Sequence, residues 1–131
     1  STDATLANLP GFTFDGIAGR SYDIDITFIY FLQTAADGIR FAISGTATFS
    51  ALRIAYELID WSTATIFSVG QITANDTAAT EAVTTIATVH LEGTAVIDAA
   101  GTVTFQAACN SNGAGTMSIV AGSVFEYQLA Q

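Results

Sequence analysis

Val89–Leu129, the last third of the chain, reads VHLEGTAVIDAAGTVTFQAACNSNGAGTMSIVAGSVFEYQL and carries the clearest structural pattern in the sequence. Three turn signals separate its apolar runs, at residues 98–101, 110–115 and 121–122. Between the first two signals, apolar and polar or small residues alternate: Val103, Phe105, Ala107 and Cys109 against Thr102, Thr104, Gln106 and Ala108. A period of two, with Gly and Asn at the breaks, is typical of antiparallel strands with one buried face. The stretch therefore predicts an all-β domain.

The first two thirds of the chain show the same alternation, with one irregular part. The segments expected to form strands are Phe12–Phe14, Tyr22–Leu32, Ile39–Ser44, Phe49–Leu58, Thr65–Val69 and 83–97. Pro10 has no N–H to donate to a ladder, so it is placed before the first strand. Residues 60–80 have no clean period and predict a long loop around one short strand, while Gly93 predicts a bulge or bend. A helix is conceivable for residues 49–58 from their composition, but strict alternation favours a strand.

About eight to ten short strands without a helix fit a single domain built as an antiparallel sandwich or jelly roll of two sheets. The chain of 131 residues divides into an N-terminal arm, residues 1–11, and a jelly-roll domain, residues 12–131. Ser1 is what removal of an initiator Met would leave, so a complete small protein is expected. The predicted core residues are Ile24, Ile26, Phe28, Phe41, Ile54, Val103, Phe105, Met117, Ile119 and Phe125.

The composition argues against two classes of binding partner. Three Arg and no Lys face twelve acids, for a net charge of −9, which argues against nucleic acid and against an anionic membrane surface. There is no apolar run long enough to span a membrane and no pattern of a signal peptide. Only 11% of the residues are charged, well under the roughly 25% of an average domain. Either the surface is rich in Thr, Ser and Ala, or part of it is buried against other subunits; we favour the second.

The alternating run Tyr22–Leu32 changes character midway. Its first half has one polar face, with Asp23 and Asp25, whereas Ile29 and Phe31 make its second half apolar on both faces. Such a strand either passes into a subunit interface or is covered on both sides within one subunit. The sequence leaves both interpretations open.

Few residues suggest chemistry. The single histidine, His90, lies mid-strand and is expected to pair with Glu92 or a hydroxyl, although three copies on a trimer axis could bind a metal. Asp23 and Asp25 lie about 7 Å apart on one strand face, a spacing that suits glycoside hydrolysis or calcium, but supporting residues are absent. The lone Cys109 predicts a small buried hydrophobe. We therefore expect no enzyme, no cofactor and no metal site.

Several segments resemble a known family. They are 93–108, Asn110-Ser111 and 120–127 in the last third, with Leu6–Leu9, 22–30, 34–43 and Asn75-Asp76-Thr77 before it. These turn-and-strand patterns resemble the C-terminal jelly-roll domains common in structural proteins of tailed bacteriophages. The resemblance covers most of the chain and implies a fold like the tumour-necrosis-factor jelly roll, assembled as a homotrimer around a three-fold axis. It implies no catalytic residues.

Within phages, such domains act as capsid decoration (cement) proteins or as modules of tail fibres and receptor-binding proteins. Because nearly the whole chain is jelly roll, without a stalk, we expect a decoration protein on the capsid surface of the virion, bound to the major capsid protein. The alternative is a tail module that recognises a host-surface glycan. The absence of a signal peptide disfavours a secreted jelly-roll signalling ligand.

Four residues are the expected partner contacts. Trp61, in the irregular part, and Asn112, in a turn, could contact a glycan or a protein partner. Pro10 belongs to the arm that would grip the shell, and Phe31 lies on the strand expected to enter an interface.

Overall fold

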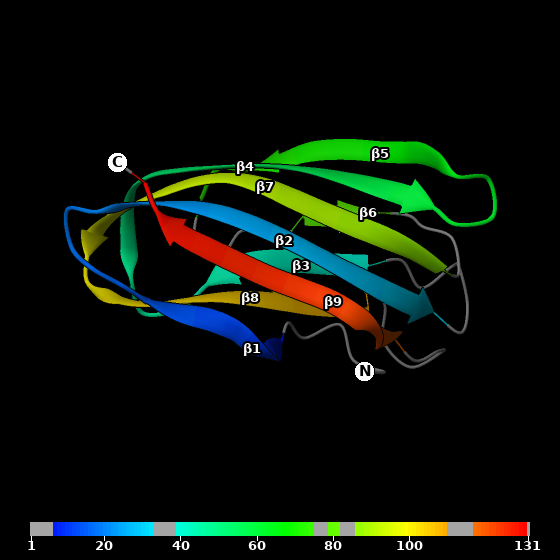
Figure 1. The fold of residues 1–131 in the computed structure, drawn as a ribbon, viewed down its shortest axis with the longest axis horizontal. Coiled ribbons are helices and arrows are strands. Elements are labelled where there is room, and N and C mark those ends of the chain that lie inside the picture. The colour runs from blue at the N-terminus through cyan, green and yellow to red at the C-terminus, as the bar shows by residue number, and fades with distance from the viewer. Residues whose placement is uncertain (1–6, 33–38, 75–78, 82–85, 110–116, 131) are drawn as a thin grey trace.

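The computed structural model describes residues 7–32, 39–74, 79–81, 86–109 and 117–130, and this part of the chain forms two antiparallel β-sheets and no helix (Figure 1). No helix that could cross a membrane occurs among these residues. The all-β prediction is confirmed, as a β-sandwich. The strands are β1 (Ala7–Gly16), β2 (Ser21–Leu32), β3 (Ile39–Ser44), β4 (Thr48–Asp60), β5 (Thr65–Ile72), β6 (Ala79–Glu81), β7 (Ile86–Ala99), β8 (Gly101–Cys109) and β9 (Met117–Leu129).

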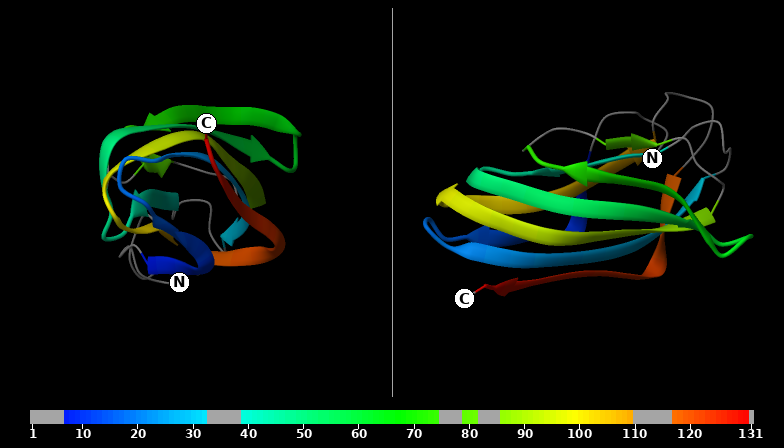
Figure 2. Two further views of the ribbon diagram at one scale, coloured as in Figure 1. Left: turned by 60° about the vertical axis from the view of Figure 1, so that its left-hand side comes forward. Right: turned by 90° about the horizontal axis from the view of Figure 1, so that it is seen from above.

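The strands pair in a nested order. One sheet has the order β1-β8-β3-β6 and the other the order β5-β4-β7-β2-β9 (Figure 2). The first strand thus pairs with the eighth, the second with the seventh, the third with the sixth and the fourth with the fifth. β9 adds an outer strand beside β2. The first eight strands therefore form one long antiparallel ribbon that folds over itself. Consecutive strands lie in different sheets, except β4 and β5, which are neighbours in the same sheet.

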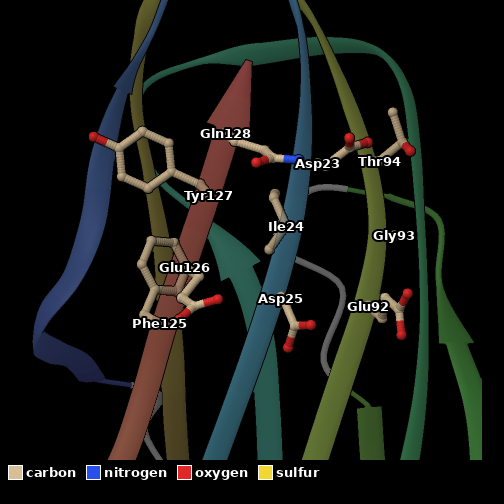
Figure 3. A pocket seen from close by; sticks show the side chains of 10 residues that line it. All are labelled: Asp23, Ile24, Asp25, Glu92, Gly93, Thr94, Phe125, Glu126, Tyr127 and Gln128. Carbon is tan, nitrogen blue, oxygen red and sulfur yellow. The ribbon is translucent and has the colours of Figure 1, made fainter. Parts of the chain in front are cut away.

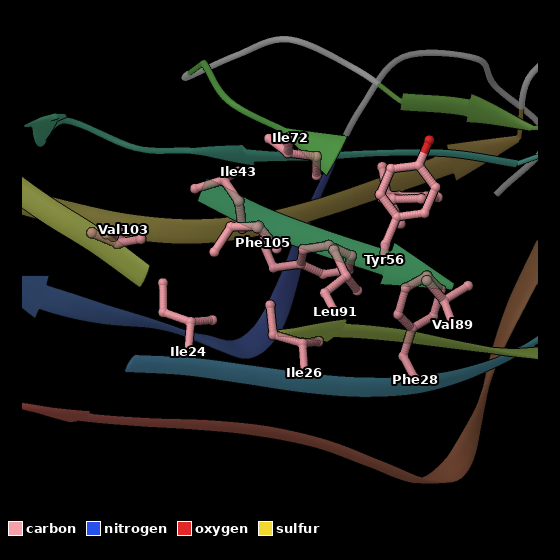
Figure 4. Packing of buried hydrophobic residues seen from close by; sticks show 14 of the residues in the cluster. Ile24, Ile26, Phe28, Ile43, Tyr56, Ile72, Val89, Leu91, Val103 and Phe105 are labelled. Carbon is pink, nitrogen blue, oxygen red and sulfur yellow. The ribbon is translucent and has the colours of Figure 1, made fainter. Parts of the chain in front are cut away.

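The core lies between the two sheets, where the alternating apolar residues meet (Figure 4). Phe105 of β8 is at its centre, because its ring lies 5.1 Å from that of Phe28, 6.3 Å from that of Phe41 and 6.2 Å from that of Phe12. Full burial of such a side chain stabilises the fold by roughly 1.5–3 kcal/mol. Seven of the predicted core residues are buried and Phe125 is half-buried, whereas the side chains of Cys109, Met117 and Ile119 lie outside the described part.

The first strand begins earlier than predicted, and Pro10 lies within it rather than before it. β1 already pairs at Asn8, opposite Gln106, and pairs again at Thr13, opposite Thr104. Residues 9–12 thus lie opposite a single residue of β8, which makes a bulge, and Gly11 has a positive φ of 80° there. Because Pro10 lies in a bulge on an edge strand, no ladder hydrogen bond requires the N–H that proline lacks, and the strand tolerates the residue. Residues 7–11 of the expected arm therefore belong to the sheet.

Two further glycine signals also differ from the prediction. Gly93 pairs in register with both neighbouring strands, without a bulge. The position requires glycine because a Cβ there would collide with the carbonyl oxygen of Arg53 on β4. At residues 121–122 the expected turn is a bulge within the continuous β9, where residues 121–123 lie opposite Phe28. Ser123 Oγ accepts a hydrogen bond of 3.0 Å from the Ile29 N–H and restores the partner that the bulge removes.

The irregular middle is more ordered than its sequence suggests. β5 runs three residues beyond the expected strand, to Ile72, and a short β6 follows, so the predicted long loop is wrong. The strand predicted for residues 49–58 is confirmed, since they lie in β4, and the alternative of a helix is excluded. The tight turn before Gly101 is confirmed. The turns predicted at 35–38, 75–77 and 110–115 lie outside the described residues.

Candidate functional site

The solvent side of the five-stranded sheet, which we call the five-stranded outer face, gathers most of the unusual surface residues. The ladder register sets its rows. One row contains Gln71, Ala55, Glu92, Asp25 and Glu126, from β5 to β9. The next contains Val69, Glu57, His90, Thr27 and Val124 in the same order. Side chains of one row point to the same side of the pleat, so residues far apart in sequence become neighbours there.

One half of this face is apolar and lies where β2 and β4 end and β7 begins, on the right in Figure 1. The apolar half consists of Phe31, Trp61 and Ile66, which are 46%, 50% and 56% exposed. Val69 and Val124, 70% and 45% exposed, lie at opposite edges of the sheet, at the two ends of the row that contains Glu57 and His90. Large exposed apolar side chains that gather at one end of a sheet are candidates for an interaction surface. Its own chain covers Phe31 only in part, which disagrees, for this residue, with the interpretation in which one subunit covers both sides of this strand.

Local hydrogen bonds hold Trp61 on the face. Its indole Nε1 donates to Thr88 Oγ1 at 2.7 Å, which lays the ring beside the outward side of β7. The turn that follows is tied back by Asp60 Oδ1, which accepts from the Ser62 N–H and from Ser62 Oγ, both at 2.8 Å. A fixed aromatic ring loses little conformational entropy when a partner binds, so Trp61 is a suitable anchor.

The other half of the face is acidic. The acidic half consists of Asp23, Asp25, Glu57, Glu92 and Glu126 around His90. His90 Nε2 lies 3.2 Å from Asp25 Oδ1 and 4.0 Å from Glu92 Oε2, whereas its Nδ1 lies 3.6 Å from Glu57 Oε1. The ligand atoms of Asp25, His90 and Glu92 lie within 4.8 Å of one another, so these three could hold a metal ion.

A depression between β7, β2 and β9 borders this acidic half (Figure 3). Its charged lining is Asp23, Asp25, Glu92 and Glu126, and Phe125 and Tyr127 line its β9 side. Of the three arginines in the chain, only Arg53 belongs to the five-stranded outer face, opposite Thr94. The acidic half therefore has a strong excess of negative charge.

The structure brings together two of the four expected contacts. Trp61 and Phe31 lie in the apolar half, although they come from different strand ends. Pro10 lies in β1, at the edge of the other sheet, and Asn112 lies outside the described residues.

The sequence indicated the neighbours of His90 and the exposed apolar residues only in part. His90 is closer to Asp25 than to the expected partner Glu92. Glu57 was not predicted to be near His90, because their strand pairing cannot be read from the sequence. Ile66, Val69 and Val124 were also missed, although an apolar residue at an outward strand position is a usable signal.

Comparison with known proteins adds no relative. No protein-family model matches the chain, and neither a curated protein nor a solved structure matches it.

Proposed function

We propose that the protein is a tailed-bacteriophage capsid decoration protein, a trimeric jelly roll that binds the assembled shell and stabilises it. The nested strand pairing supports the jelly-roll part of this proposal, because a jelly roll is a two-sheet sandwich of eight strands in two Greek keys. The resemblance in the sequence supports the phage part, and the low charge content supports the trimer.

The observation that carries a binding function is the five-stranded outer face. Its apolar half supplies aromatic anchors of the kind that dominate protein interfaces. Its acidic half suits a partner with Lys and Arg beside apolar residues, such as a basic patch on a capsid protein. A second copy of this chain suits it less, because the chain has only three arginines and no lysine. We therefore assign this face to the shell.

The mechanism is mass action. A trimer that bridges adjacent capsid subunits binds the assembled shell and not the free subunits, so it favours the assembled state. Three weak contacts on one trimer also reinforce one another through their effective concentration. Gel filtration with light scattering tests the trimer, and a monomeric mass would remove this part of the proposal.

The first experiment is the copy number per virion, measured by quantitative mass spectrometry against the major capsid protein. Hundreds of copies would support decoration. A handful in multiples of three would support a tail position, and absence from virions would contradict the virion proposal.

A binding experiment tests the face itself. Phage heads assembled without the protein should bind the wild type and resist heat better afterwards. Trp61→Ala should weaken binding about 30-fold, since a hot-spot residue is worth roughly 2 kcal/mol. Ile17→Ser is the matched control, because Ile17 is 57% exposed but lies in the turn between β1 and β2. Heads that do not bind the wild type would contradict decoration, and equal losses in both variants would contradict the assignment of the face.

The second candidate is a tail-fibre or receptor-binding module that recognises a host-surface glycan. The exposed and anchored Trp61 favours it, since sugar rings stack on aromatic side chains. A glycan array would identify the sugar, and its binding should disappear in Trp61→Ala.

A further inference from the structure

Asp25, His90 and Glu92 form a mixed nitrogen and oxygen ligand set on a rigid scaffold. Asp25 and Glu92 are directly opposite each other on the hydrogen-bonded strands β2 and β7, and His90 lies two residues before Glu92 on the same face. Two backbone ladders, with β4 and with β2, hold β7 in the middle of the sheet. The three ligand atoms lie within 4.8 Å of one another before any ion draws them closer.

The orientation of the imidazole is a separate indication. Nε2 faces the two carboxylates of the set, whereas Nδ1 faces a third carboxylate, Glu57 on β4. Histidines that ligate metals commonly donate their other ring N–H to a carboxylate, which fixes the tautomer and raises the basicity of the ligating nitrogen. Glu57 Oε1 lies 3.6 Å from Nδ1, slightly beyond a hydrogen bond, so a small movement of its side chain would bring it to the place of such an outer carboxylate.

The local charge also favours a cation. Within the described residues, the ion pairs of Asp25, Glu57 and Glu92 are with His90 alone. Three carboxylates around one imidazole leave negative charge that a dication would offset.

We propose that Asp25, His90 and Glu92 bind a divalent transition-metal ion, with Zn²⁺ as the representative, and that Glu57 orients His90. Imidazole together with carboxylates suits zinc and its neighbours, whereas calcium and magnesium prefer oxygen ligands alone. The side chains of Asp25 and Glu92 are 51% and 71% exposed, so they can move inward to the distance of about 2.0–2.2 Å that zinc requires. The remaining coordination positions open to solvent. This site does not depend on the proposed function.

Calorimetric titration of the tag-free protein with zinc chloride tests the site. The wild type should bind one ion per chain. His90→Ala and Glu92→Gln should each weaken binding more than tenfold, and Glu57→Gln about 10–100-fold, as for outer-shell partners. Glu126→Gln is the matched control, since it removes the same charge from the residue opposite Asp25 on β9 and should change the affinity less than threefold.

Two outcomes of the titration would overturn the proposal. One is the absence of saturable binding at one ion per chain. The other is an equal loss in Glu126→Gln and Glu92→Gln, which would mean diffuse attraction to the acidic half rather than coordination. Thermal unfolding without metal checks that every variant is folded.

NMR with Co²⁺ supplies a direct readout, because His90 is the only histidine in the chain. Its imidazole proton signals should be strongly shifted or broadened by one equivalent of Co²⁺, and excess Zn²⁺ should reverse the change. A ring that stays unaffected while Co²⁺ binds would place the ion elsewhere and contradict the assignment.

Discussion

The outer faces of the two sheets differ in whether their polar side chains bond to one another or face solvent. On the four-stranded sheet, Thr13 and Thr104 share a hydrogen bond of 2.9 Å between their hydroxyls, and Gln106 Nε2 donates to Asn8 Oδ1 at 2.7 Å. Thr104 is only 6% exposed there, and Ala42 is fully buried. The five-stranded outer face instead directs Trp61 and a group of carboxylates toward solvent. Among the described residues, the five-stranded outer face is the one that combines an exposed aromatic ring with a group of exposed carboxylates.

The largest effect is expected from a substitution that disrupts the sheet carrying the five-stranded outer face. Gly93→Ala should lower the free energy of unfolding by about 3 kcal/mol, the upper end of overpacking costs, because its Cβ would collide with the backbone of Arg53. Gly70→Ala is the control: its Cβ would meet the far end of the Tyr56 side chain, at Oη, Cζ and Cε1, so relief requires a shift of one side chain against the edge strand β5 and not of paired backbone in the middle of the sheet. Urea unfolding should show the smaller loss for Gly70→Ala, and equal losses would contradict the backbone explanation.

Replacing one threonine by valine on each outer face compares the hydrogen bonds of the two faces directly. Thr104→Val should cost about 1 kcal/mol, since it removes a hydrogen bond at a nearly buried position. Thr88→Val should cost less than about 0.5 kcal/mol, because its bond to Trp61 is exposed and water can replace it. Urea unfolding measures both, and the fluorescence of the single tryptophan should change only in Thr88→Val. A larger cost for Thr88→Val would contradict the comparison.

The smallest expected effect concerns the apolar half. Phe31→Ser should change the free energy of unfolding by less than about 0.5 kcal/mol, because the side chain is 46% exposed. Calorimetry of thermal unfolding measures the change at a protein concentration where the oligomeric state is known. A loss above about 1.5 kcal/mol would mean that the ring is packed in the assembled protein, as in a subunit interface.

Prediction from the sequence succeeded where the signal is local. The alternation in residues 22–32, 39–44 and 49–58 indicated both the strands and their buried sides, because a period of two follows directly from the geometry of one strand. It failed at Pro10 and at residues 121–122, where a bulge keeps the strand continuous despite a turn-like sequence. Irregular β5 was also underestimated, because its order depends on pairing with β4.

By itself, the sequence determined the all-β class, the core residues of the alternating strands and the acidic character of the molecule. Only the tertiary structure decided which residues meet. Asp25 and His90 are 65 positions apart, and Trp61 lies beside Thr88 from another strand. These neighbours arise from strand pairing, which depends on how the whole ribbon folds over the shared core. A local pattern specifies which side of its own strand a residue occupies, whereas the residue on the next strand is set by register.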